Sequence, residues 1–231
     1  MPRTLLLDLD GTLVDSLPDL AASLNRVLGA RGLPPFGLAE VRAMVGDGVG
    51  ALLDRAFAAR ARARDASALD DFMGDYAVHL ADATRPYPGV APTLARLAAE
   101  GWRLAVCTNK PERLARQLLA TLDLARHFAA IGGGDSFPVR KPDPAHVLAT
   151  LAAAGGTPGR AVLIGDGVND LRAARSAAIP YVFAAWGYGS PELAAGAAAR
   201  AERFAELPGL IAGLPGLAPG GAPISPPRPP P

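Results

Sequence analysis

The chain has 231 residues, a formal net charge of +1 and one cysteine. This length suits one large α/β domain, or one domain that carries an insertion. A nearly neutral chain has no long-range field that would gather nucleic acid or an anionic membrane, and one cysteine excludes an intrachain disulfide.

The N-terminal segment predicts a buried strand followed by helices. Residues 4–9 form a short apolar run that ends in an Asp-Gly turn signal, and they are too short for a signal sequence or a membrane span. We therefore expect a cytoplasmic location. From Asp15 to about Tyr87 apolar residues recur at helical spacing, with no convincing strand between them. Residues 16–87 are therefore expected to form a helical insertion.

The second half alternates between strand and helix patterns. Strands are expected at 103–107, about 128–132, 161–165 and 181–184, each separated from the next by a helix. This repeat requires a parallel sheet, and right-handed crossovers place helices on both of its faces. We expect an α/β core of residues 1–15 and 88–214. Residues 215–231, rich in proline, are expected to form a disordered tail.

Four polar clusters each lie where an apolar run stops. They begin at Asp8, Thr108, Lys141 and Asp166. Strand C-termini line one edge of an open parallel sheet, so residues more than a hundred positions apart can share one pocket there. A set of carboxylates, one hydroxyl and one ammonium suits a divalent cation and a phosphate ester.

The first cluster contains two carboxylates, on Asp8 and Asp10. Strand alternation alone would send them to opposite faces, but a turn at Gly11 can bring both into the pocket. Unlike environments can then make one the nucleophile and the other the general acid/base.

The remaining clusters complete the pocket. Asp166 is expected to bind a cation directly, while Asp170, one turn further along, either binds it too or braces the lysine. Thr108 and Lys141 can hold phosphoryl oxygens. Lys141 is one of only two lysines in a chain rich in arginine, and Lys110 is the other.

These four clusters, in this order, resemble the four motifs of the haloacid dehalogenase superfamily. Asp8-Leu9-Asp10-Gly11-Thr12 resembles its phosphatase branch, and the insertion lies where that superfamily carries a helical cap. The segments 15–20 and 45–49 look like the phosphoglycolate phosphatase group. The resemblance implies a Rossmann-like, doubly wound core, dependence on Mg²⁺, and a small phosphorylated metabolite as substrate.

The resemblance also implies catalytic roles. Asp8 attacks phosphorus, and Asp10 protonates the leaving alkoxide and then activates water. Thr108 and Lys141 hold the transferring group, with help from the Asn109 backbone.

The implied Mg²⁺ ligands are Asp8, the backbone carbonyl of Asp10 and Asp166. Asp170 supports both the metal and Lys141. One departure is Gly167, where many relatives have Ser or Thr, but it removes no motif ligand.

The segment Gly46-Asp47-Gly48 is expected to close over the substrate. It imitates a nucleotide-binding glycine loop, but no strand precedes it, which disfavours that function. Two rival functions stay open: a phosphosugar mutase of the same superfamily, and a non-catalytic interaction module. The oligomeric state is not predicted.

Overall fold

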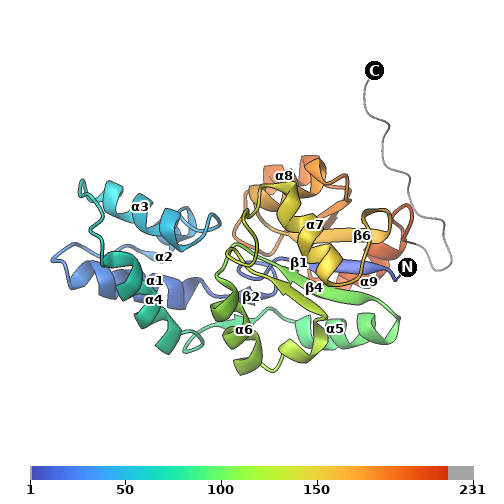
Figure 1. Cartoon of the computed structure of the whole chain (residues 1–231), viewed down its shortest axis with the longest axis horizontal. Coiled ribbons are helices and arrows are strands. Elements are labelled where there is room, and N and C mark those ends of the chain that lie inside the picture. The colour runs from blue at the N-terminus through green and yellow to red at the C-terminus, as the bar shows by residue number, and fades with distance from the viewer. Residues whose placement is uncertain (1, 218–231) are drawn as a thin grey trace, which may run out of the picture.

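The computed structural model describes residues 2–217 and contains a six-stranded parallel sheet (Figure 1). The strand order is β5-β4-β1-β6-β7-β8, and every neighbouring pair runs parallel. The strands are β1 (Thr4–Leu7), β4 (Arg103–Cys107), β5 (Ala130–Gly132), β6 (Ala161–Gly165), β7 (Tyr181–Ala184) and β8 (Ala199–Ala201).

The central strand β1 shows why this sheet needs helices on both faces. Leu5 and Leu7 belong to one apolar cluster, Leu6 belongs to another, and all three are fully buried. Successive side chains of a strand point to opposite faces, so a continuous leucine run demands cover on each side.

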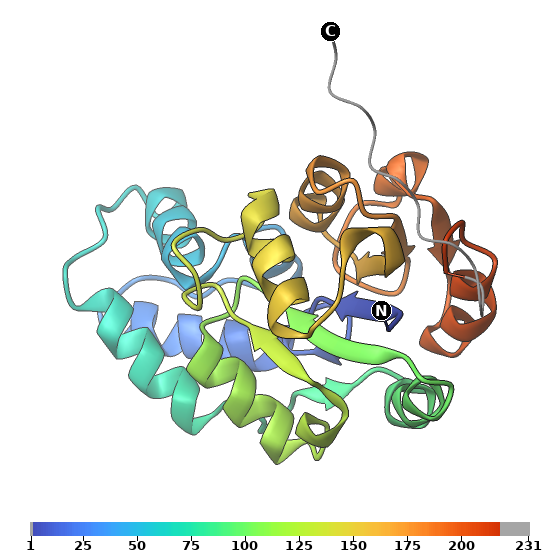
Figure 2. The ribbon, with the colours of Figure 1, turned by 45° about the vertical axis from the view of Figure 1, so that its right-hand side comes forward.

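Helices supply that cover from both sides. α7 (Pro144–Ala153) and α8 (Val168–Ser176) pack on the face of Leu6, whereas α5 (Val90–Ala99), α6 (Glu112–Thr121) and α9 (Leu207–Ala212) contribute to the cluster on the other face. Figure 2 shows the sheet between these two groups.

The remaining helices form a separate group beside the C-terminal edge of the sheet (Figure 1). They are α1 (Leu17–Gly29), α2 (Leu38–Arg42), α3 (Val49–Ala59) and α4 (Ala68–Val78). The chain enters and leaves this group through a two-stranded antiparallel pair, β2 (Val14–Asp15) and β3 (Arg85–Pro86). No helix among residues 2–217 has both the length and the apolar character needed to cross a membrane.

The predicted fold class, a doubly wound α/β sheet with a helical insertion, is confirmed. Three short strands were missed: β2, β3 and β8. β1 ends at Leu7 rather than at residue 9, because the chain curls at Leu9, whose carbonyl accepts from the backbone N–H groups of residues 12 to 14. Of the tail expected over residues 215–231, Leu217 is buried and its carbonyl accepts a hydrogen bond from Arg3, and residues 218–231 lie outside the described residues.

Candidate active site

The loop after β1 brings Asp8 and Asp10 into one cavity. The Leu9 carbonyl accepts hydrogen bonds from the backbone N–H groups of residues 12, 13 and 14, which curls the chain tightly. Gly11 has φ +82°, and a Cβ there would lie 2.5 Å from the Asp166 carboxylate. Glycine is therefore needed both for the turn and for the approach of Asp166.

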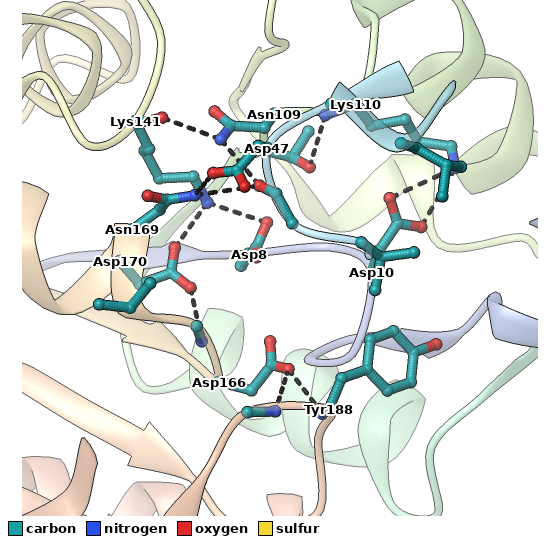
Figure 3. Close-up of a pocket in the computed structure, with 18 of the residues that line it drawn as sticks. Asp8, Asp10, Asp47, Asn109, Lys110, Lys141, Asp166, Asn169, Asp170 and Tyr188 are labelled. Carbon is teal, nitrogen blue, oxygen red and sulfur yellow. Dashed lines mark hydrogen bonds and ion pairs between the residues drawn. The ribbon is translucent and has the colours of Figure 1, made fainter. Parts of the chain in front are cut away.

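The cavity has a volume of about 360 Å³ and lies at the C-terminal edge of the sheet (Figure 3). All the residues predicted for the site line it: Asp8, Asp10, Gly46, Asp47, Gly48, Thr108, Asn109, Lys141, Asp166 and Asp170. The sheet edge thus collects side chains from four separate loops, as the parallel topology requires.

Three carboxylates form the floor of the cavity. Oxygens of Asp8, Asp166 and Asp170 lie within 4.8 Å of one another. Burial, together with the charge of Asp170, raises the pKa of Asp8 to about 7. Burial and the charge of Asp8 raise the pKa of Asp166 to about 6. The cluster therefore needs positive charge to stay ionised.

One ammonium supplies part of that charge. Lys141 Nζ lies 2.9 Å from Asp8 Oδ1 and 2.6 Å from Asp170 Oδ1, and it donates to the Cys107 carbonyl at 2.6 Å. Burial opposes its charge, but Asp170 and Asp8 outweigh burial and raise the pKa of Lys141. Lys141 is therefore a permanent cation beside Asp8.

Asp170 is bound through both oxygens. Oδ1 accepts from Lys141, and Oδ2 accepts from the backbone N–H of Gly167 at 3.0 Å. Of the two roles considered for Asp170, the bracing of the lysine has direct contacts in this structure.

Asp166 is held by loops on either side of it. Oδ1 accepts from the Thr12 hydroxyl at 3.0 Å, and Oδ2 accepts from the backbone N–H groups of Tyr188 and Gly189 at 2.6 and 3.2 Å. These donors fix the carboxylate without supplying a full positive charge.

The donor set fits a hard divalent cation. Carboxylate oxygens are preferred by Mg²⁺, and three of them converge here with one lysine to offset their charge. Burial raises the pKa of Asp8 and of Asp166, and a neighbouring carboxylate, Asp170 for Asp8 and Asp8 for Asp166, raises each pKa further. A bound divalent ion would remove the repulsion between these carboxylates.

The Asp10 carboxylate is held away from this cluster (Figure 3). Its Oδ1 accepts from the Ser16 hydroxyl at 2.5 Å, and Lys110 Nζ donates to its two oxygens at 3.1 and 3.4 Å. Lys110 Nζ also donates to the Tyr76 hydroxyl of α4 at 2.7 Å. The two carboxylates of the first cluster thus have different cationic partners.

The loop between α2 and α3 closes the cavity from the helical side. The Gly46 carbonyl accepts from the side-chain amides of Asn109 and Asn169, at 3.0 and 3.2 Å. Asn169 also donates to Asp47 Oδ1 at 2.6 Å. A segment of the insertion thereby contacts two loops of the core.

Several cavity residues were missed by sequence reasoning, namely Lys110, Asn169, Tyr188 and Arg42. Lys110 had a usable signal, since it directly follows Thr108-Asn109 and is one of only two lysines. Tyr188 lies between two glycines in a loop close to Asp166, which only the fold reveals.

Comparison with known proteins identifies the family. The model of the haloacid dehalogenase-like hydrolases matches residues 2–178. The chain belongs to this family. Among curated relatives, a phosphoglycolate phosphatase of Caulobacter vibrioides is 45% identical over 189 residues, covering 80% of each chain. Another, of Rhodospirillum rubrum, is 43% identical over 216 residues and covers 90% of each chain.

Solved structures of the family share the same architecture. A predicted phosphoglycolate phosphatase from Haemophilus somnus superposes with a TM-score of 0.82 at 31% identity, covering 90% of this chain and 97% of that one. CbbY from Rhodobacter sphaeroides, solved in complex with phosphate, gives 0.75 at 25% identity, with 90% and 96% covered. The predicted family and the predicted enzyme class, a phosphatase within it, are confirmed.

Proposed function

We propose that this member of the family is a Mg²⁺-dependent phosphomonoester hydrolase that acts through an aspartyl-phosphate on a small phosphometabolite. The best candidate substrate is 2-phosphoglycolate. The observation that carries the proposal is the separation of the two carboxylates of the first motif. Asp8 lies beside Lys141 and the carboxylate cluster, while Asp10 lies beside Lys110.

Asp8 is the proposed nucleophile. Its Oδ1 lies 2.9 Å from Lys141 Nζ, and its backbone N–H donates to the Ile164 carbonyl at 2.9 Å, so both ends of the residue are fixed. The attacking oxygen forms a bond to phosphorus while the bond from phosphorus to the ester oxygen breaks. Lys141 and the Thr108 hydroxyl, which both line the cavity, are the proposed donors to the non-bridging oxygens.

Asp10 is the proposed acid and base. It gives its proton to the departing ester oxygen and then takes one from the water that hydrolyses the aspartyl-phosphate. Its contacts with Ser16 and Lys110 hold its carboxylate away from Lys141 and the carboxylate cluster around Asp8 (Figure 3).

Asp8, the Asp10 backbone carbonyl and Asp166 are the proposed Mg²⁺ ligands, with Asp170 supporting the ion and Lys141. The ion, when bound, neutralises the charge that phosphate would otherwise meet among these carboxylates.

Residues 16–87 are the proposed cap over the core of residues 1–15 and 88–214, and Gly46, Asp47 and Gly48 are the proposed contacts to the leaving group. The cavity of about 360 Å³ has room for a phosphoryl group and a small leaving group. The curated relatives described above are named phosphoglycolate phosphatases. The cytoplasmic location remains a proposal, checked by fractionation of cells that express the protein.

A phosphate-release screen with Mg²⁺ over a few dozen phosphometabolites tests the proposal. We expect two- and three-carbon phosphates to lead in kcat/KM, ahead of hexose phosphates and nucleotides. Chelation of the metal should abolish turnover. Leading hexose phosphates would contradict the substrate but not the mechanism, and retention of phosphate on an isomerised product would favour a mutase. Failure to hydrolyse even p-nitrophenyl phosphate would favour an interaction module.

A further inference from the structure

Lys110 is a buried cation at the far wall of the cavity from Lys141. It follows Asn109 in the loop between β4 and α6, and its backbone N–H donates to the Thr108 hydroxyl at 3.2 Å. Its side chain is only 2% exposed, yet it contributes to the cavity wall. The burial of an ammonium costs free energy unless the charge is paired, so a buried lysine at a cavity wall indicates a specific role.

Contacts from two directions fix the ammonium. The Tyr76 hydroxyl accepts from it at 2.7 Å, and the Tyr76 ring centroid lies 4.5 Å from Nζ. The second partner is the Asp10 carboxylate, at 3.1 Å. Burial opposes the charge of Lys110, but Asp10 raises its pKa. Lys110 therefore enters the cavity as a positioned positive charge.

Asp10 marks where the leaving oxygen of a substrate would lie, because the proposed acid must reach that oxygen at hydrogen-bond distance. An ammonium 3.1 Å from Asp10 is thus close to the first carbon of the leaving group. In a phosphoglycolate-type ester one methylene separates the ester oxygen from a carboxylate. That carboxylate falls within reach of Lys110.

The Lys110 ammonium can donate a hydrogen bond to such a carboxylate. Among residues 2–217, its three N–H groups meet three oxygens, the two of the Asp10 carboxylate at 3.1 and 3.4 Å and the Tyr76 hydroxyl at 2.7 Å. The N–H on the long 3.4 Å contact is the one that can turn to a substrate carboxylate. A charge pair formed in a buried site is stronger than one formed at the surface.

We propose that Lys110, held in place by Tyr76, is the specificity residue that recognises a carboxylate on the leaving group. The class of substrate is a phosphate monoester with a carboxylate one carbon from the ester oxygen. This inference rests on the proposed function and deepens it, since the residues around phosphorus cannot distinguish one ester from another.

The test compares 2-phosphoglycolate with 2-phosphoglycolamide, in which a neutral amide replaces the carboxylate. We expect the wild type to favour the carboxylate in kcat/KM by at least about tenfold, and Lys110→Met to reduce that preference to within about threefold. Both rates should also fall, because Asp10 loses a partner, so the ratio is the informative quantity. Lys110→Arg should retain part of the preference.

Arg42→Met is the matched control. Arg42 also lines the cavity, but its guanidinium donates to the Gly187 and Tyr188 carbonyls rather than contacting Asp10. Its loss should leave the ratio unchanged. A ratio that falls in Arg42→Met and persists in Lys110→Met would overturn the inference.

A binding experiment separates this inference from the proposed function and from misfolding. In an Asp8→Asn background, calorimetry with Mg²⁺ should show that Lys110→Met weakens the binding of 2-phosphoglycolate at least about tenfold more than the binding of 2-phosphoglycolamide. Thermal unfolding checks that each variant is folded. Equal weakening would overturn the role of Lys110. A wild type that binds both compounds but hydrolyses no ester would contradict the proposed function alone.

Discussion

The N-terminus of α1 depends on a hydroxyl from a loop more than 170 positions away. Ser16 is at the N-cap position, but its side chain donates to Asp10 instead of accepting from the helix. The Tyr188 hydroxyl takes over, accepting from the backbone N–H groups of Ser16 and Leu17 at 2.8 and 3.0 Å and donating to Asp15 at 2.8 Å. Tyr188→Phe removes this cap and leaves the ring.

The expected loss of stability follows from those contacts. Ser16 is fully buried, so its N–H loses its acceptor at a cost of about 1–3 kcal/mol. Leu17 keeps a weak alternative in Asp15 Oδ1 at 3.4 Å and should add less than about 1 kcal/mol. We expect the free energy of unfolding to fall by about 1–4 kcal/mol in total.

Urea denaturation measures this change, with an unaltered slope showing that the folded state is intact. Tyr181→Phe is the control, because the Tyr181 hydroxyl donates to the Gly165 carbonyl at 2.8 Å, and the loss of this hydrogen bond should cost about 1 kcal/mol. A loss below about 0.5 kcal/mol for Tyr188→Phe would refute the assignment of this hydroxyl as the cap.

Three further outcomes are expected. Asp8→Asn should keep the fold and lower turnover by at least about 10³-fold in a phosphate-release assay, so activity within tenfold of the wild type would exclude Asp8 as the nucleophile. Asp10→Asn should lower turnover by about 10²–10⁴-fold, while Mg²⁺ affinity measured by calorimetry changes less, since a backbone carbonyl is the proposed ligand. Because the pKa of Asp8 is raised to about 7, the metal-free folded protein binds more protons than the unfolded chain between pH 3.8 and about 7. The free energy of unfolding of the metal-free protein should therefore fall as pH rises through that window. Thermal unfolding should accordingly show a larger stabilisation by Mg²⁺ at pH 8 than at pH 5, and an equal shift would contradict the carboxylate cluster as the metal site.

Local patterns were sufficient to predict the architecture and the convergence of the polar clusters. The leucine run before Asp8 indicates one buried strand, and the βα repeat after Gly89 indicates the others. The carboxyl ends of such parallel strands lie at the same edge of the sheet. The turn at Gly11 was likewise readable, since Asp-Gly is a strong local signal.

The contacts that distinguish Asp8 from Asp10 were not readable. The ion pair between Lys110 and Asp10 joins positions 100 apart in the sequence. The Tyr188 backbone N–H donates to Asp166 because the loop after β7 lies beside the loop after β1. The three missed strands are two or three residues long, too short to show a period. Long-range packing, not local propensity, determines these features.

The central place of β1 has a consequence for how the chain is made. Leu5 pairs with Leu104 on one side and with Val162 on the other, so β1 is synthesised before both of its partner strands, which follow about 100 and 160 residues later. At ribosomal rates of about 5–20 residues per second, its leucines stay unpaired for on the order of ten seconds. A nascent chain that stops before β6 offers an apolar strand with an open edge to chaperones or to other nascent chains. Asp8 is thus synthesised well before the strands that place it in the site.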